Sequence, residues 1–223
     1  MGRLAGAVLI FLSLAATAAA STTPADVYRT AIQSAAAKNS VHYVVRSNVG
    51  GNAQLMVCDA ALGRGVQRIT FTKGGTTGHV TVLLVANTAY VRGDAFTLAQ
   101  YLGLTSAQAS QFAGRWFFLK PPNGAYRAVS RDVSLQSFVV DLLMPAPYTT
   151  APTTIIGGHA VTGVRSRVKN AGRSATITLY IGAGSPLPVA QVEQAPTGKV
   201  TTTLSRWNER VSVTAPSGAV AFP

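Results

Sequence analysis

The side chains that could do acid–base chemistry or hold a metal are few and scattered in this 223-residue chain, which has seven carboxylates and three histidines. Asp132 and Asp141 lie nine residues apart in one predicted helix, too far apart to share a proton. His42, His79 and His159 each stand alone at a predicted strand end or in a turn, and no HExxH or CxxC spacing occurs. The sequence therefore predicts no catalytic residue, no metal site and no cofactor.

Nucleophilic side chains also lack the local sequence that would activate them. Serines are frequent, but none lies in a G-x-S-x-G turn, so a Ser-His-Asp site would have to assemble from distant segments. Cys58 is the single cysteine and lies in the apolar run QLMVCDA, which indicates a buried thiol. The glycine-rich segment 74–78 lacks the Lys-Ser/Thr of a phosphate-binding loop and is interpreted as a hairpin turn. An enzyme is the least supported class of protein.

The N-terminal 20 residues have the three parts of an export signal: Arg3, an apolar core over 4–14, and small residues up to Ser21. Leu14-Ala15-Ala16 resembles the start of a lipobox, but Thr17 stands where lipidation requires cysteine. We therefore predict a signal peptide (1–20) cleaved near Ala20 and an exported protein that is not lipidated, extracellular or in the cell envelope. The alternatives are an uncleaved anchor, although the apolar part covers about half of a ~20-residue span, or a cytosolic protein.

The formal net charge is +12, although charged residues make up 12% of the chain, because acidic residues are scarce. The densest basic run, which ends at Arg173, places Arg165, Arg167 and Lys169 on one face of a predicted strand. No aromatic platform accompanies this run, so nucleic acid is not the expected partner. The run is either an ordinary solvated face or a surface attracted to an anionic membrane or to wall polymers.

Hydrophobic patterning predicts a first helix over 24–38 with Thr23 as N-cap, followed by strands that alternate with glycine-rich turns. The strands are expected at 41–49, 53–60, 66–73, 79–86 and 88–94. Helices are expected at 94–103, 105–114 and 132–144, with an extended stretch at 115–122 and a proline-rich linker or loop at 145–154. The last third predicts strands at 159–169, 174–182, 187–195, 199–208 and 210–216. This order indicates one α+β domain over 21–223, built on an antiparallel meander.

Several short stretches, together with this order of elements, resemble a known family. They are AYVRGD (89–94), GRWFFL (114–119), GSPLPVAQVE (184–193) and TTTLSRWNERVSVTAP (201–216). The pattern resembles the half-barrel envelope proteins, namely the LppX/LprG-like lipoproteins and the LolA/LolB lipoprotein carriers, over roughly residues 24–216. The resemblance implies a strongly curved antiparallel sheet with an N-terminal helix and two to three helices on its concave face. It also implies a carrier of lipids or lipoproteins whose cavity holds acyl chains, with no chemistry and no polar site motif.

The residues that would line such an apolar cavity alternate on the predicted strands or lie on the apolar faces of the predicted helices. They are Ile69, Phe71, Val82, Leu84, Phe96, Leu98, Leu102, Phe112, Phe138, Leu142, Ile177, Leu179 and Ile181. The same pattern also fits a close-packed core without a cavity. The two hypotheses are thus a monomeric lipid carrier, untethered because of Thr17, and a basic envelope-associated interaction module with a filled core.

Overall fold

The computed structural model of the chain describes residues 22–170 and 173–222. The predicted signal peptide, the cleavage site after Ala20 and Thr17 lie outside the described residues. Within the described ranges, no helix combines the length and the apolar character that crossing a membrane requires.

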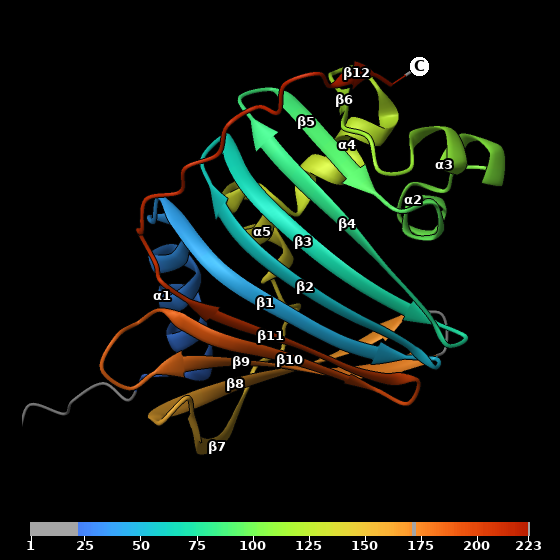
Figure 1. Cartoon of the computed structure of the whole chain (residues 1–223). Coiled ribbons are helices and arrows are strands. Elements are labelled where there is room, and N and C mark those ends of the chain that lie inside the picture. The colour runs from blue at the N-terminus through green and yellow to red at the C-terminus, as the bar shows by residue number, and fades with distance from the viewer. Residues whose placement is uncertain (1–21, 171–172, 223) are drawn as a thin grey trace, which may run out of the picture.

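The described residues form one sheet of 12 strands that curves into an open half-barrel (Figure 1). The strand order is β12-β6-β5-β4-β3-β2-β1-β11-β10-β9-β8-β7, and all neighbours are antiparallel except the pair β12 and β6. The first part of the chain supplies β1 (Ser40–Val49), β2 (Asn52–Ala61), β3 (Arg64–Lys73), β4 (Thr76–Val85), β5 (Thr88–Gly93) and β6 (Phe117–Leu119). The last part supplies β7 (Thr149–Ile156), β8 (His159–Asn170), β9 (Arg173–Gly182), β10 (Pro188–Ala195), β11 (Gly198–Ser205) and β12 (Val220–Ala221).

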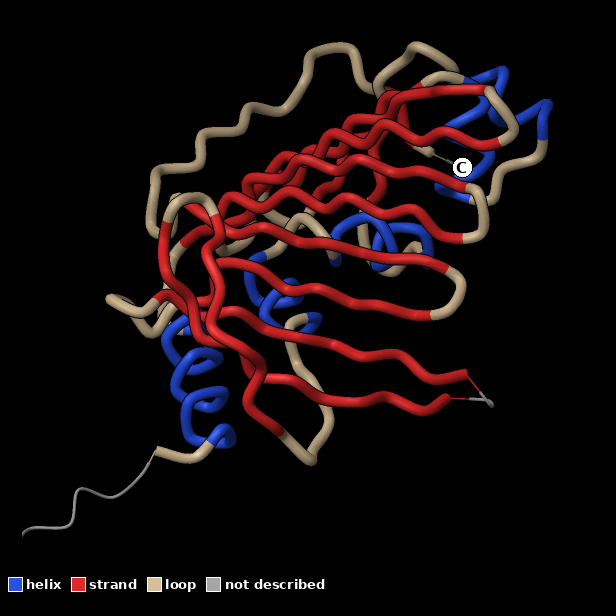
Figure 2. The backbone as a smooth tube through the Cα atoms, turned by 90° about the horizontal axis from the view of Figure 1, so that it is seen from below, coloured by secondary structure: helices blue, strands red, loops and turns tan. Residues whose placement is uncertain are grey.

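Helices lie on the concave side of this sheet and at its β6 end, as Figure 2 shows. Helix α1 contacts β7, β8 and β10, and helix α5 contacts β2 and α1. Helix α2 contacts β4 and α3, whereas helix α4 contacts β5. Their bounds are α1 (Pro24–Ala36), α2 (Ala95–Leu102), α3 (Ser106–Phe112), α4 (Gly124–Arg131) and α5 (Leu135–Asp141). The predicted α+β half-barrel is confirmed, with four helices after β5 in the described chain where two to three were expected.

Capping side chains explain where three helices begin, and the N-cap Thr23 was predicted from the sequence. Thr23 and Thr105 each form a capping box, with Asp26 and Gln108 respectively. Asp94 caps α2 by accepting a hydrogen bond from the backbone N–H of Thr97, and Gly103 ends that helix in the left-handed conformation. The meander strands β1–β5 follow the predicted ranges to within three residues at each end.

Two predictions about the remaining elements are wrong, one helix was not expected, and the last predicted helix is shorter than expected. The expected linker at 145–154 contains most of strand β7, whose Pro152 is tolerated because β7 is the edge of the sheet. The expected strand at 210–216 is instead part of an irregular strap (206–219), which runs from β11 past the ends of β1–β5 to β12 (Figure 1). Helix α4 was not expected, and the helix predicted at 132–144 spans Leu135–Asp141.

Candidate functional site

The concave face is built from one side of each strand, and the strand register identifies its side chains. Across the middle of the sheet, directly opposed residues run from Tyr43 through Cys58, Gln67 and Val82 to Val91. All five are buried. Because alternate residues of a strand point to opposite faces, this row places residues such as Ile69, Leu84 and Leu204 on the same concave face.

The chain that leads into α5 lies directly against this row. Tyr43 Oη donates a hydrogen bond to the carbonyl oxygen of Asp132, and Cys58 Sγ lies 3.4 Å from the same oxygen. Gly65 leaves room for this approach, since a Cβ there would lie 2.7 Å from Val133 Cγ1. A parallel bridge between Ala61 and Ser134 continues the contact. The insert between β6 and β7 is thus fixed to the sheet through its backbone.

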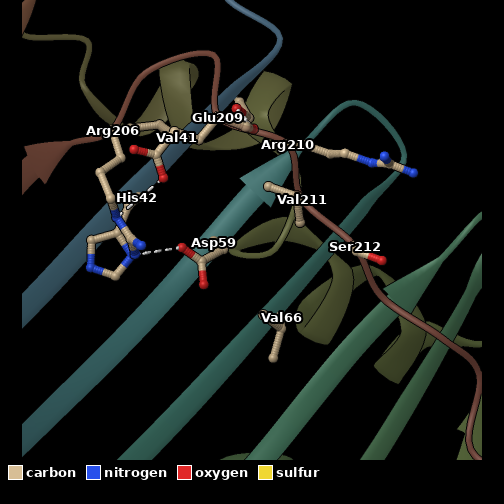
Figure 3. A pocket seen from close by; sticks show the side chains of 10 residues that line it. Val41, His42, Asp59, Val66, Arg206, Glu209, Arg210, Val211 and Ser212 are labelled. Carbon is tan, nitrogen blue, oxygen red and sulfur yellow. Dashed lines mark hydrogen bonds and ion pairs between the residues drawn. The ribbon is translucent and has the colours of Figure 1, made fainter.

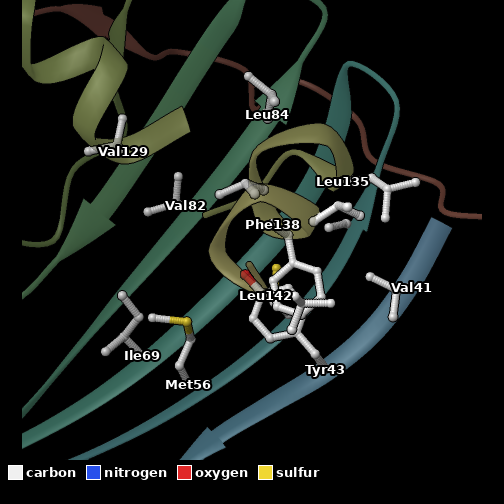
Figure 4. Packing of buried hydrophobic residues seen from close by; sticks show 14 of the residues in the cluster. Val41, Tyr43, Met56, Ile69, Val82, Leu84, Val129, Leu135, Phe138 and Leu142 are labelled. Carbon is white, nitrogen blue, oxygen red and sulfur yellow. The ribbon is translucent and has the colours of Figure 1, made fainter. Parts of the chain in front are cut away.

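Helix α5 packs its apolar side against β1 and β2, as Figure 4 shows. The ring of Phe138 stacks on Tyr43 with centroids 4.1 Å apart and an interplanar angle of 12°. Leu142 is 1% exposed, and its carbonyl accepts a hydrogen bond from Gln191 Nε2 on β10 at 3.1 Å. Between α5 and the middle of the sheet, the concave face is therefore filled by protein side chains.

Helix α2 covers the concave face nearer the turns that follow β1 and β3. Its N-terminus is held by Asp94, whose carboxylate accepts hydrogen bonds from the backbone N–H groups of His79 and Thr97. At its other end, Tyr101 Oη donates a hydrogen bond to the buried Gln67 Oε1 at 3.1 Å. Between α2 and strands β2 and β3 lies a small cavity of about 180 Å³, lined by Gln54, Ile69, Phe71, Thr97, Gln100 and Tyr101.

The structure divides the thirteen predicted cavity residues into two groups. Nine are buried in the contiguous core: Ile69, Val82, Leu84, Leu98, Phe112, Phe138, Leu142, Leu179 and Ile181. Of these, Phe112 packs apart from α5, against Phe117 and Phe222 near β12. Four are half-buried: Phe71, Phe96, Leu102 and Ile177. Phe71 and Phe96 face each other with ring centroids 6.0 Å apart, next to the small cavity.

Burial raises the pKa of the acidic groups beneath the helices. The pKa of the Cys58 thiol rises to about 12, mainly because burial disfavours the thiolate, and the thiol is 0% exposed. This agrees with the prediction of a buried cysteine. Desolvation, followed by repulsion from Asp141, raises the pKa of the Asp132 carboxyl, while Arg131 and Gln67 act in the opposite direction. The interior of the half-barrel is thus an environment that disfavours charge.

One histidine cluster that the sequence pattern does not predict lies on the convex face (Figure 3). His42 Nδ1 lies 2.6 Å from Asp59 Oδ1, and the Arg206 guanidinium lies 3.1 Å from the same oxygen. His42 and Asp59 are directly opposed in the β1–β2 hairpin. The two-residue turn at Gly50-Gly51 fixes the register of this hairpin, so it is the sequence signal from which the pairing could have been predicted. The pocket beside them measures about 310 Å³.

This convex cluster anchors the strap, and among the residues that the structure describes His42 is bonded to Asp59 and Arg206 and to no serine hydroxyl. Ser40 Oγ donates a hydrogen bond to the carbonyl oxygen of Glu209. Asn208 Oδ1 accepts a hydrogen bond from the backbone N–H of Asn39, and the backbone N–H of Asn208 donates to the carbonyl oxygen of Ser40. Glu209 pairs with Arg206 at 3.7 Å. The described residues therefore bring His42, Asp59 and Arg206 together, and the Arg206–Asp59 ion pair attaches the strap to β2. In the same ranges, no group of three metal-ligating side chains occurs.

Comparison with known proteins identifies the fold. LprF from Mycobacterium bovis is 18% identical to the chain with a TM-score of 0.58, and the match covers 87% of this chain and 97% of LprF. The Mycobacterium tuberculosis lipoprotein LppX is 17% identical with a TM-score of 0.54, and the match covers 86% and 98%. No protein-family model and no curated protein sequence matches the chain. The expected resemblance to LppX-like half-barrels is confirmed at the level of the fold.

Proposed function

We propose that this chain is an exported, non-catalytic carrier of lipids in the bacterial envelope, and that it holds acyl chains against the concave face of its half-barrel. The observation that carries the proposal is the small cavity between α2 and β2–β3, where Ile69, Phe71 and Tyr101 offer apolar and aromatic surface beside polar side chains. The half-buried pair Phe71 and Phe96 lies next to it. Apolar side chains at a site that water can reach are the feature that an acyl chain recognises. The lipoprotein LppX shares the fold, which supports a role in the envelope.

The size of the cavity defines how a lipid would bind. At about 180 Å³ it is smaller than the roughly 300–1,000 Å³ of typical small-molecule sites. The site must therefore widen on binding, and α2 is the element that borders it. The C-terminal end of α2 is held to the sheet by the Tyr101–Gln67 hydrogen bond and is followed by Gly103, whereas Asp94 fixes its N-terminal end. We infer that the Tyr101 end swings away from the sheet and extends the cavity past Ile69 toward Gln67.

The exported state, the free N-terminus and the absence of catalysis belong to the same proposal. Thr17 in place of the lipobox cysteine supports a chain that is released by cleavage after Ala20. The buried Cys58 thiol and the strap-anchoring role of His42 and Asp59 favour binding without a reaction. We expect a monomer that exchanges its lipid with membranes or with other carriers.

A pair of tryptophan variants on neighbouring residues tests the acyl site. Gln54 lines the cavity on the concave face, and Leu55 points to the convex face with 38% exposure. Filling the cavity with Gln54→Trp should weaken binding of a fluorescent fatty-acyl probe by about tenfold or more, since the indole occupies the space of several methylenes, each worth ~0.8 kcal/mol. Leu55→Trp should leave probe binding within about twofold. Equal binding by both variants, or no binding by the parent protein, would reject the site.

A further inference from the structure

The basic residues of the sheet gather on its convex face. The strand register places eight cations there, opposite the side that α5 covers: Arg46, Arg64, Arg68, Arg92, Arg165, Arg167, Lys169 and Lys199. Seven of them are exposed and Arg165 is half-buried. Among the ion pairs of the described residues, none involves any of these eight. Their charges are therefore directed at the surroundings and not at the protein.

Carboxylates are nearly absent from the same face. In the described strands, Asp59 is the convex acidic residue, and it is already paired with His42 and Arg206 near the strap. Glu193 lies on the concave side. It is directly opposed to Ile177, which is directly opposed to Ser166, and Ser166 points away from its convex neighbours Arg165 and Arg167 on β8. The convex face thus carries a nearly uncompensated positive charge, which favours an anionic partner.

Five of the cations form a continuous band across the sheet, in the order Arg92, Arg68, Arg46, Lys199 and Arg167. Arg92 and Arg68 both lie beside Thr81, two strands apart, which is roughly 10 Å at ~4.8 Å per strand. By the same geometry, Arg46 lies about 12 Å from Arg68, Lys199 about 8 Å from Arg46, and Arg167 about 14 Å from Lys199. At low salt these gaps are shorter than the Debye length, so the charges act together, whereas at physiological salt (~8 Å) the wider gaps are partly screened and the combined attraction becomes salt-sensitive.

The shape and the spacing residues of the band favour a flexible chain over a flat bilayer. The band follows eight strand-to-strand steps from β5 to β8 around the curved sheet (Figure 1), so a flat surface would touch only part of it. Its spacer positions include the hydrogen-bonding side chains of Thr81, Thr201, Gln194 and Thr176, together with the apolar Val57 and Leu55 on β2. Aromatic anchors, which are typical of membrane-surface helices, do not occur among these spacers.

We propose that the convex band binds a flexible anionic polymer that carries hydroxyl groups, such as an acidic polysaccharide or a polyol phosphate. The arginine and lysine side chains pair with the acidic groups along the polymer, and the threonine and glutamine side chains bond its hydroxyls. This surface lies on the opposite side of the sheet from the acyl site. Lipid and polymer can therefore bind at the same time, and the inference does not depend on the proposed lipid function.

The test compares two triple variants that remove the same charge. The band variant is Arg46→Gln, Arg68→Gln and Lys199→Gln, and the control is Arg115→Gln, Lys120→Gln and Arg127→Gln, whose cations are exposed outside the band. Binding of fluorescein-labelled dextran sulfate is measured by anisotropy at about 0.02 and 0.15 M salt. The band variant should bind about 10- to 100-fold more weakly than the parent, and the control within about threefold. Neutral dextran should not bind, and circular dichroism should show that all proteins are folded.

Three results would overturn the proposal. An equal loss in the two variants would mean that net charge, and not the band, attracts the polymer. Absence of salt-sensitive binding by the parent would mean that the face does not recognise polyanions. Tighter binding to anionic phosphatidylglycerol vesicles than to dextran sulfate at about 0.15 M salt, with the band variant losing vesicle binding, would assign the surface to a bilayer.

Discussion

Gly65→Ala tests whether the segment 132–134 is fixed on the concave face as the structure shows. The added Cβ would lie 2.7 Å from Val133 Cγ1 and 2.8 Å from the Asp59 carbonyl oxygen, and closer still to the Val133 carbonyl. Two of these three atoms are backbone, so the segment must move away from the sheet. Such a shift would also lengthen the hydrogen bond from Tyr43 to Asp132.

The magnitude follows from two opposing effects. Alanine is preferred over glycine in a strand by about 0.5–1 kcal/mol, whereas overpacking a filled core costs about 1–3 kcal/mol and the weakened hydrogen bond about 1 kcal/mol. The net loss of about 2 kcal/mol corresponds to a Tm lower by roughly 4–8 °C for a chain of this size. Urea unfolding should show the same loss as a lower midpoint with an unchanged slope.

A second glycine provides the matched control. Gly124 begins α4, and a Cβ there meets no atom within 4 Å. Gly124→Ala should leave the free energy of unfolding unchanged or raise it by up to about 1 kcal/mol. If Gly65→Ala were as stable as Gly124→Ala, the close contact between Gly65 and Val133 would not exist, and the docking of the insert would have to be revised.

Three further predictions concern titration, thiol reactivity and export. Burial raises the folded-state pKa of the Asp132 carboxyl above its usual 3.8. The protonated carboxyl therefore stabilises the fold, and this stabilisation is lost as the pH rises through the folded-state pKa. Asp132→Asn should therefore be more stable than the parent at pH 7 and lose this advantage in acid, which urea midpoints measured across the pH range would reveal. A stability difference that does not change with pH would contradict the raised pKa of Asp132. Cys58 should not react with Ellman's reagent in native buffer and should react fully in denaturant, because the thiol is buried with a pKa of about 12; rapid native labelling would show that the segment 132–134 opens. Exported protein should begin at or near Ser21 without a diacylglycerol, as intact mass and N-terminal sequencing would establish, whereas an intact Met1 would indicate an uncleaved anchor.

Much of the fold was predictable from local patterns. Runs of β-branched residues separated by glycine-rich turns predict the meander, and the N-cap Thr23 predicts where α1 begins. The strand expected at 210–216 alternates correctly but does not form. The reason is that β11 is already paired on both sides by β1 and β10, which leaves no free edge beside it. The edge strand β7 was missed because the prolines of the stretch 145–154 indicate a loop. One of them, Pro152, lies within β7, where it is tolerated because β7 is at the edge of the sheet.

The site was predictable in part. Alternation on the strands correctly orients Ile69, Phe71 and Leu179 toward the concave face. It does not tell which of these residues a ligand can reach, because access depends on how closely the helices pack. Leu179 is 0% exposed beneath the helices, whereas Phe71 is half-buried beside the cavity. The convex band likewise required the register of eight strand pairs, which no single stretch of sequence reveals.

The central claim, that the concave face holds lipid acyl chains, is tested most directly by the molecules that accompany the protein. Native mass spectrometry of the exported protein, purified without detergent, should show the mature chain together with a bound lipid, and an organic extract should identify that lipid. The adduct should be reduced in Gln54→Trp and retained in Leu55→Trp, since these side chains lie on opposite faces of β2. A parent protein with the mass of the bare chain, a lipid-free extract and no uptake of an added fatty-acyl probe would contradict the account.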